Sequence, residues 1–258
     1  LGKEVALGES LSLGTVDIIN TGVGFLKNSY APLTISDYPF VLRDFNHWNA
    51  YITSPLFKEL TAGYAKVSGN KIAAITYYGS RHVTSNKAVL KPSDMKGMKI
   101  RVPNAPAFML FPKQVGANPT PMAFSEVYLA LQQGVVDAQE NPLPTIKFKK
   151  FYEVQKHINL TSHITNGMFT IVGGSTLNKL STTDEKLLAK AINIGAAMAS
   201  AEIKKQEGNL AAWFRSKGVT VNVVDRKPFI AAVAPFYVAG KDLPFSKELY
   251  EKFINLGK

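Results

Sequence analysis

Short apolar runs alternate with longer amphipathic segments along the whole chain. Runs of four to six residues that are rich in β-branched and aromatic side chains and bounded by turn residues are typical of buried strands. The runs that fit this description span residues 16–19, 72–77, 99–102, 135–138, 169–172 and 219–224. Because such strands alternate with helical segments, the chain is predicted to adopt an α/β fold.

Residues 124–131 are predicted to form a helix. Apolar side chains recur there at the i, i+3, i+4 and i+7 positions that share one helix face. They are Phe124, Val127, Tyr128 and Leu131. Gly134 follows closely and is the expected stop, because glycine readily adopts the left-handed conformation that ends many helices. Taken alone, this pattern makes Phe124 a core residue.

A longer helix is predicted from Thr182 towards Gly218. A capping box between Thr182 and Glu185 marks its start. The apolar stripe along this helix consists of Leu187, Ala191, Ile194 and Met198. Gly195 and Gly208 lie inside the segment, so a kink or a break is expected there.

The composition narrows the class of protein. The chain has 258 residues, 46% of them hydrophobic, which suits one large domain or two lobes with a sizeable core. No apolar run reaches the roughly 20 residues that a membrane helix needs, so the chain is not expected to span a membrane. Cysteine is absent, which excludes disulfide bonds, thiolate metal sites and cysteine nucleophiles.

The formal net charge is +11, from 30 Lys and Arg against 19 Asp and Glu. Such an excess of positive charge can favour the binding of nucleic acid, anionic lipid or an anionic small ligand. The basic residues are dispersed, and the densest group lacks the base-stacking aromatic motifs of a nucleic-acid module. That group consists of Lys147, Lys149, Lys150 and Lys156. A solvated basic surface is the favoured interpretation, with mild support for an anionic ligand and none for nucleic acid.

Polar side chains gather at the ends of four predicted strands. They are Asn20, Thr21, Tyr78, Arg81, Arg101 and Asn141. In open α/β sheets, ligands bind beyond the carboxyl ends of the strands, so these side chains are expected to share one site. Two guanidinium groups and an amide would bind a carboxylate, because a guanidinium presents paired donors that match the two carboxylate oxygens.

These residues also have purely structural interpretations. Arg101 could be a buried strand residue that pairs with Asp94 or Glu140. Arg81 could be a loop charge in contact with solvent, and Asn141 could be an ordinary turn starter. The residue pattern alone leaves both interpretations open.

Three stretches between residues 91 and 163 are specific enough to suggest a family. They read KPSDMKGMKIRVPNA, GANPTPMAFSEVYLALQQGVVDAQENP and KFYEVQKHINLTSH. They resemble the substrate-binding proteins of TRAP transporters, the DctP-like family, and most closely the sialic-acid-binding members. The opening LGKEVALGESLSLGTVDIINTG looks like the first helix and second strand of that family. Members carry a signal peptide, a strand and a helix before this point, so an N-terminal portion is expected to be missing from this numbering.

The resemblance implies a type II periplasmic-binding-protein fold, with two α/β lobes, hinge strands between them and one long helix that spans both. Residues 1–78 and 167–206 would form the first lobe. Residues 79–166 and 207–258 would form the second. The chain would cross between the lobes at residues 78–80 and 166–169, and the helix that starts at Thr182 would be the spanning one.

The resemblance also implies roles for individual residues. Arg101, in the R-V-P motif, would form a bidentate ion pair with the ligand carboxylate, assisted by Asn141 of the E-N-P motif. Arg81, in YGSRHVTSNK, matches a second arginine that contacts the carboxylate in many members. Phe124, in MAFSEVY, matches an aromatic residue that packs against the ligand.

The expected ligand is a small sugar acid. Sialic-acid-binding members carry a glutamate close to where Thr21 stands, and its absence argues against sialate. A uronate or an aldonate would use the same carboxylate clamp with different partners for its hydroxyl groups. The candidates for these partners are Asn20, Thr21, Tyr38, Tyr78 and Asn166.

The function implied by the resemblance is that of a periplasmic solute receptor. It would act as a monomer without cofactor or metal, close its lobes on a carboxylate and deliver it to TRAP membrane permease subunits. The main alternative is an enzyme acting on an organic acid, with Glu140 or a histidine as base beside Arg101. The four histidines show no metal-binding spacing, and no nucleotide-binding glycine loop is present. A third possibility is a basic surface-adhesion protein.

Overall fold

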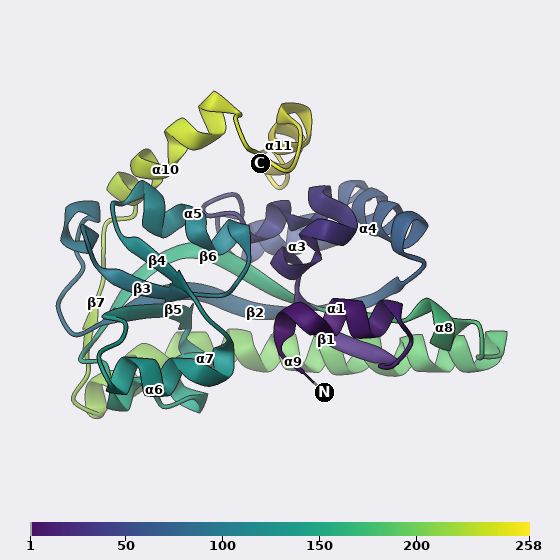
Figure 1. Ribbon diagram of the computed structural model, residues 1–258, viewed down its shortest axis with the longest axis horizontal. Coiled ribbons are helices and arrows are strands. Elements are labelled where there is room, and N and C mark those ends of the chain that lie inside the picture. Colours follow the sequence, from purple (N-terminus) through teal and green to yellow (C-terminus); the bar gives the residue numbers. More distant parts are fainter. Residues whose placement is uncertain (1) are drawn as a thin grey trace.

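Two long antiparallel strands form the centre of the fold. In the computed structural model, which describes residues 2–258, β2 (Lys71–Ser85) and β6 (His157–Val172) pair along nearly their whole length. The remaining strands are β1 (Ile18–Gly22), β3 (Lys99–Val102), β4 (Asn118–Pro121), β5 (Ala138–Pro142) and β7 (Thr220–Asn222). The order across the mixed sheet is β1-β6-β2-β5-β3-β4, and β7 lies beside β6. β1 pairs with one end of β6, whereas β5 and β7 pair at the opposite end of the two long strands. The long strands therefore connect two halves of the molecule (Figure 1).

Helices cover both faces of this sheet (Figure 1). On one face lie α3 (Phe45–Thr53), α4 (Pro55–Ser68), α5 (Pro106–Gln114), α10 (Lys227–Ala239) and α11 (Lys247–Ile254). On the other lie α6 (Val127–Gln132), α7 (Leu143–Phe148) and α9 (Thr182–Ser216). The other helical segments are α1 (Glu4–Ser12), η1 (Val23–Leu26), α2 (Lys27–Tyr30), η2 (Ala31–Asp37), η3 (Pro92–Met95), η4 (Phe124–Glu126), η5 (Phe151–Glu153) and α8 (Gly174–Leu177). Within residues 2–258, no helix is both long and apolar enough to cross a membrane.

The mixed α/β architecture predicted from the sequence is confirmed, but several strands extend beyond their apolar runs. β2 and β6 continue well past the runs at 72–77 and 169–172. β1 begins and ends later than the run at 16–19, and β5 begins only where the run at 135–138 ends. As a result, Asn20, Tyr78, Arg81 and Asn141 lie within strands, and the prediction that they follow strand ends is wrong. Backbone N–H and C=O groups in these polar stretches form hydrogen bonds with neighbouring strands. The strands therefore continue beyond the last hydrophobic residue of each run.

The long helix α9 is present, with three differences from its prediction. Its N-cap is Ser181, whose Oγ accepts a hydrogen bond from the Asp184 backbone N–H, so the expected cap at Thr182 lies one residue too late. The helix continues past both internal glycines without a break. The stripe of Leu187, Ala191, Ile194 and Met198 faces solvent, because the helix lies against β2 through Ala196 and its neighbours instead.

The helix α9 also forms hydrogen bonds with the middle of β2. Glu207 Oε1 accepts a hydrogen bond from the Ser80 backbone N–H at 2.6 Å, and its Oε2 accepts one from the Tyr77 hydroxyl at 2.9 Å. Gly79 lies between these two residues with a φ of 115°. The segment in which the chain passes from one half to the other is thereby held against a helix that runs along both halves (Figure 1).

Replacement of Gly79 by alanine is expected to lower the free energy of unfolding by about 2 kcal/mol or more. An added Cβ would lie 2.8 Å from Pro142 Cβ and 3.0 Å from Glu207 Oε1, at a φ that L-residues rarely adopt. Gly69→Ala is the matched control, because Gly69 also has a positive φ but nothing lies within 4 Å of an added Cβ. Urea unfolding should show a smaller loss for Gly69→Ala; equal losses would mean that the contact with Pro142 is unimportant.

The last helix, α11, packs on α3. Arg43 Nη1 and Nη2 donate hydrogen bonds to the carbonyl oxygens of Ile254 and Leu256 at 2.7 and 2.9 Å. The Phe253 ring lies 4.4 Å from the ring of Tyr51, and both side chains are fully buried. Residues 247–254 thus contact a helix of the range assigned to the first lobe, although the sequence placed them in the second. The lobe boundaries themselves stay a prediction.

Candidate functional site

A cavity of about 190 Å³ lies between the two halves of the molecule. It is smaller than the roughly 300–1,000 Å³ pockets of drug-sized ligands, so it suits a small molecule. The lining residues come from α1, β1, η1, β2, β3, α5, η4, β5 and β6. They are Glu4, Asn20, Thr21, Gly22, Phe25, Tyr78, Arg81, Arg101, Pro103, Phe108, Phe124, Asn141, Asn166 and Met168.

Arg101 is the cation of this cavity that lacks an acidic partner. It extends from β3, is 2% exposed, and donates from Nε and Nη2 to the carbonyl oxygen of Met122 at 3.1 and 2.7 Å. No carboxylate among residues 2–258 lies within 4.0 Å of its guanidinium nitrogens. Burial, together with repulsion from Arg81, lowers the pKa of Arg101 to about 10, which still leaves it charged at neutral pH. A buried cation of this kind is costly unless an anion joins it.

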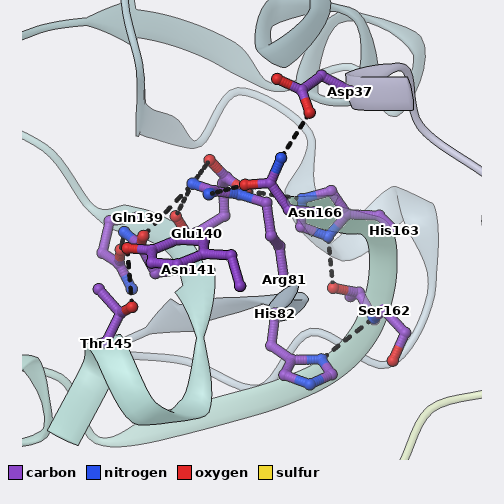
Figure 2. A network of polar contacts seen from close by, with 12 residues as sticks. Asp37, Arg81, His82, Gln139, Glu140, Asn141, Thr145, Ser162, His163 and Asn166 are labelled. Carbon is purple, nitrogen blue, oxygen red and sulfur yellow. Dashed lines mark hydrogen bonds and ion pairs between the residues drawn. The ribbon is translucent and has the colours of Figure 1, made fainter. Parts of the chain in front are cut away.

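Arg81, in contrast, is paired within the protein. Its Nε and Nη2 donate to the two carboxylate oxygens of Glu140 at 2.5 and 2.7 Å, in a bidentate arrangement. His163 Nε2 lies 3.1 Å from the same carboxylate (Figure 2). Burial alone would raise the pKa of Glu140, but Arg81 and His163 outweigh burial and hold that pKa at about 2. The alternative in which Arg101 pairs with Glu140 or Asp94 is therefore wrong, because Glu140 binds Arg81 and Asp94 accepts hydrogen bonds from backbone N–H groups.

Asn166 connects this pair to the other half of the molecule. Its Oδ1 accepts from Arg81 Nη1 at 3.2 Å, and its Nδ2 donates to Asp37 Oδ1 at 2.5 Å (Figure 2). Asp37 is fully buried at the end of η2, and burial raises its pKa to about 7 despite the hydrogen bonds from Gly24 and Asn166. The network holds Arg81, Asn166 and Asp37 in fixed positions beside the cavity.

The walls of the cavity are aromatic. The Arg101 guanidinium carbon lies 5.8 Å from the centre of the Phe124 ring, and that of Arg81 lies 4.9 Å from the centre of the Phe108 ring. Phe124 also packs edge-on against Phe151 in the core behind it. Core packing and cavity lining thus coexist at Phe124, and the rings limit how far water can solvate the two arginines.

Eight of the nine predicted ligand-binding residues line this cavity. They are Asn20, Thr21, Tyr78, Arg81, Arg101, Phe124, Asn141 and Asn166. Tyr38 does not line it: its ring is buried and packs edge-on against Phe245 at 5.0 Å. The Asn141 amide donates to Gln139 Oε1 at 2.6 Å, so this donor is already in use within the protein. The Tyr78 hydroxyl accepts from Thr145 Oγ1 at 2.8 Å, which leaves its own proton for another acceptor.

Glu4 is the one charged residue of the cavity lining that sequence reasoning missed. It lies in the first turn of α1, and its Oε1 accepts a hydrogen bond from the Phe124 backbone N–H at 3.3 Å. Next to it, Lys3 Nζ lies 2.5 Å from Glu126 Oε1, so α1 contacts η4 across the cavity. Glu4 exerts an electrostatic attraction on Arg101 without contacting it. No local motif marks Glu4, because only the tertiary fold brings α1 to this position.

A larger hollow lies elsewhere in the molecule. It measures about 510 Å³ and lies between α3, α4, β2 and α9, and none of its lining residues is charged. Within the part of the chain that the structure describes, no three His, Asp or Glu side chains are placed to hold a metal ion. Unlike that hollow, the cavity at Arg101 contains buried cationic groups that can bind an anion.

Buried histidine beside the network is expected to make stability acid-sensitive. Burial, then repulsion from His163 and Arg226, lowers the pKa of His82 to about 3, against 6.5 for an unperturbed histidine. Between these values the unfolded chain binds a proton that the folded protein does not. The stability from neutral His82 is thus present above pH 6.5 and is lost as the pH falls towards 3. His163 and His47, whose pKa values are also lowered, likewise make the protein less stable as the pH falls. Asp37, whose pKa is raised, makes it more stable as the pH falls.

The variant His82→Gln should reduce this dependence, because glutamine keeps a hydrogen-bond acceptor but does not titrate. Between about pH 4 and 6, the slope of the free energy of unfolding against pH should fall by up to about 1.4 kcal/mol per unit. Urea unfolding at a series of pH values measures this slope. Identical slopes for the variant and the wild type would contradict the assignment of a neutral, buried His82.

Comparison with known proteins places the chain in a family. The family model for bacterial extracellular solute-binding protein, family 7 (DctP), matches residues 1–241. The sialic acid-binding periplasmic protein SiaP of Vibrio cholerae is 39% identical over 237 residues, which is 92% of this chain and 74% of that protein.

Solved structures agree with this match. A TRAP periplasmic solute-binding protein from Polaromonas, bound to D-erythronate, superposes with a TM-score of 0.92 at 34% identity over 100% of this chain and 85% of that one. Another from Roseobacter denitrificans, with bound 3-deoxy-D-manno-oct-2-ulosonic acid, gives a TM-score of 0.94 at 27% identity over 100% and 86%. The predicted two-lobe binding-protein fold is thus confirmed. With a cavity that offers an unpaired buried arginine, and with these matches, the chain belongs to the DctP family of TRAP-transporter solute-binding proteins, whose members are receptors for small acids and not enzymes.

Proposed function

We propose that this protein is a periplasmic receptor that binds one monocarboxylic sugar acid in the cavity at Arg101 and delivers it to a TRAP membrane permease. The observation that carries the proposal is the unpaired guanidinium of Arg101, which is 2% exposed and faces a cavity of about 190 Å³. A carboxylate that accepts two hydrogen bonds from this group would neutralise a buried charge, which supplies both affinity and orientation.

Other polar residues of the cavity lining favour a polyhydroxylated ligand. Glu4, Asn20 and Thr21 line the cavity with oxygen and amide groups that can bind hydroxyl groups. The Glu4 carboxylate would repel a second carboxylate on the ligand, which disfavours dicarboxylates. The relative SiaP is a sialic acid-binding protein, and the two solved structures hold D-erythronate and 3-deoxy-D-manno-oct-2-ulosonic acid. Each of these acids carries one carboxylate and several hydroxyl groups.

Lobe closure would supply the signal to the permease. The ligand would contact β3 and η4 in one half and β1 and α1 in the other, so it would stabilise the closed arrangement by its greater affinity for that state. The receptor is proposed to act as a monomer and to need no cofactor or metal.

An enzymatic role for the same site has weak support. Glu140, the base considered beside Arg101, does not line the cavity, and its pKa of about 2 makes it a poor proton acceptor. His163 is fully buried and interacts with Glu140 and with Thr161. Neither group can reach a ligand in the cavity without rearrangement of the network.

A thermal-shift screen tests the proposal. Purified protein is melted with aldonates, uronates, sialate and 3-deoxy-D-manno-oct-2-ulosonate, with dicarboxylates such as succinate and malate as the contrasting set. Ligand binding to the folded state raises the melting temperature as its concentration exceeds Kd. We expect a clear increase with at least one sugar acid and little with the dicarboxylates. The converse result, or recovery of a chemically changed acid after incubation, would contradict the proposal.

A further inference from the structure

A group of basic and aromatic side chains forms an exposed patch at the end of α7. The basic–aromatic patch consists of Lys147, Phe148, Lys149, Trp213 and Lys217. Lys147, Phe148 and Lys217 are exposed, whereas Lys149 and Trp213 are half-buried. Phe148 is 79% exposed, which is unusual for a side chain of its size at a helix end surrounded by lysines. The charge of this segment was visible in the sequence, but the proposed ligand-binding function does not use it.

Three lysines of the patch are held on aromatic rings and not by acids. The Nζ atoms of Lys147 and Lys217 lie 4.6 and 5.5 Å from the centre of the Trp213 ring. Lys149 Nζ lies 5.6 Å from the centre of the Phe148 ring. Among residues 2–258, no carboxylate lies within 4.0 Å of these three amines, whereas the neighbouring Lys150 pairs with Glu153. The positive charge of the patch is therefore not neutralised within the protein.

The patch also borders the candidate site. Lys149 Nζ lies 4.9 Å from the centre of the Phe124 ring, and Phe124 lines the cavity. Trp213 belongs to α9, whose other end lies in the opposite half of the molecule (Figure 1). A surface that binds this patch would thus lie next to the wall of the ligand cavity.

We propose that the basic–aromatic patch binds the surface of an anionic phospholipid membrane. Lysines near such a surface are attracted to the headgroups, and an exposed aromatic ring inserts at the boundary between headgroups and acyl chains. A stable protein partner would need about 800 Å² of contact on each side. A patch of five side chains at one helix end is small for that purpose, but it suits lipid headgroups.

Vesicle co-sedimentation tests the proposal. The probes are vesicles of phosphatidylcholine alone and vesicles that also contain phosphatidylglycerol, at about 0.1 M salt, where the Debye length is about 10 Å. We expect the wild type to bind the anionic vesicles more strongly. The double variant Lys147→Gln/Lys217→Gln should weaken this binding at least about fivefold, and Phe148→Ser should weaken it as well. Raising the salt concentration should release the protein.

Matched controls separate the patch from the net charge of the whole protein. Lys186→Gln/Lys190→Gln removes two exposed charges from the far end of α9, and Val238→Ser removes an apolar side chain that is 85% exposed on α10. Both should bind vesicles like the wild type, and circular dichroism should show all variants folded. Three results would overturn the proposal: no preference of the wild type for anionic vesicles, patch variants that bind like the wild type, or control variants that lose as much binding as the patch variants.

Discussion

Replacement of Arg101 by lysine is expected to weaken the binding of the sugar acid at least about 100-fold. Arg101 is fixed by two hydrogen bonds to the Met122 carbonyl oxygen and has no acidic partner, so its remaining donors are oriented for a ligand. A lysine keeps the charge but presents a point cation, which cannot match both oxygens of a carboxylate. It is also shorter, so the buried carboxylate would lose contacts without gaining water. Isothermal titration calorimetry with the acid that gives the largest thermal shift measures the loss.

The control for this variant is Arg215→Lys. Arg215 is exposed near the end of α9 and donates one hydrogen bond to the Val221 carbonyl oxygen. Its replacement should leave the affinity for the acid unchanged. If Arg101→Lys is folded and binds the acid within about threefold of the wild type, Arg101 does not bind the carboxylate as described.

Replacement of Glu140 by glutamine is expected to lower the free energy of unfolding by about 3 kcal/mol or more. Glu140 is 1% exposed and is the bidentate partner of Arg81. Without its charge, the guanidinium of Arg81 stays buried with only neutral acceptors, which is far costlier than the loss of a solvated ion pair. Urea unfolding monitored by circular dichroism measures the change.

An exposed ion pair provides the comparison. Lys247 and Glu251 lie 3.8 Å apart on α11, with side chains 76% and 57% exposed, so Glu251→Gln should cost less than about 1 kcal/mol. Combining Glu140→Gln with Arg81→Met should recover part of the stability, because the second change removes the unpaired cation. If Glu140→Gln costs no more than Glu251→Gln, the buried pair does not stabilise the fold in the way described.

The sequence predicts the class of fold because hydrophobic periodicity reflects burial. The alternation of apolar runs and helical segments is local information, and it correctly indicates an α/β architecture. The strand ends are less predictable, since Arg81 remains in β2 through pairing with β5 and β6, and Tyr78 lies in an irregularity of the same strand between the paired residues Tyr77 and Gly79. Polar residues that border a cavity interrupt the hydrophobic pattern by which a strand is recognised. The apolar run therefore ends before the strand itself ends.

The stripe on α9 has a related explanation. Leu187, Ile194 and Met198 have the spacing of a buried face, yet they are 61%, 51% and 70% exposed. Periodicity shows that a helix has an apolar face, but it does not show which neighbour covers that face. In this structure the contacts with β2 fall on other residues, among them Ser200, whose hydroxyl accepts a hydrogen bond from the Tyr77 backbone N–H.

The candidate site was predictable where its residues lie in recognisable motifs. Arg101 in R-V-P and Phe124 in MAFSEVY were located in this way, and both line the cavity. Glu4 and Asp37 were missed because each approaches the site from a segment distant in sequence: Glu4 contacts the backbone of residue 124, and Asp37 contacts Asn166. Contacts between residues so far apart in the sequence cannot be predicted from the local sequence pattern.

Native mass spectrometry of the purified protein mixed with a panel of sugar acids shows whether Arg101 holds the ligand, because it detects which intact acid the protein retains. We expect that the wild type retains one monocarboxylic sugar acid at one molecule per chain and that Arg101→Lys, folded as shown by circular dichroism, retains none. Retention of no acid by the wild type, or equal retention of the same acid by Arg101→Lys, would contradict this expectation.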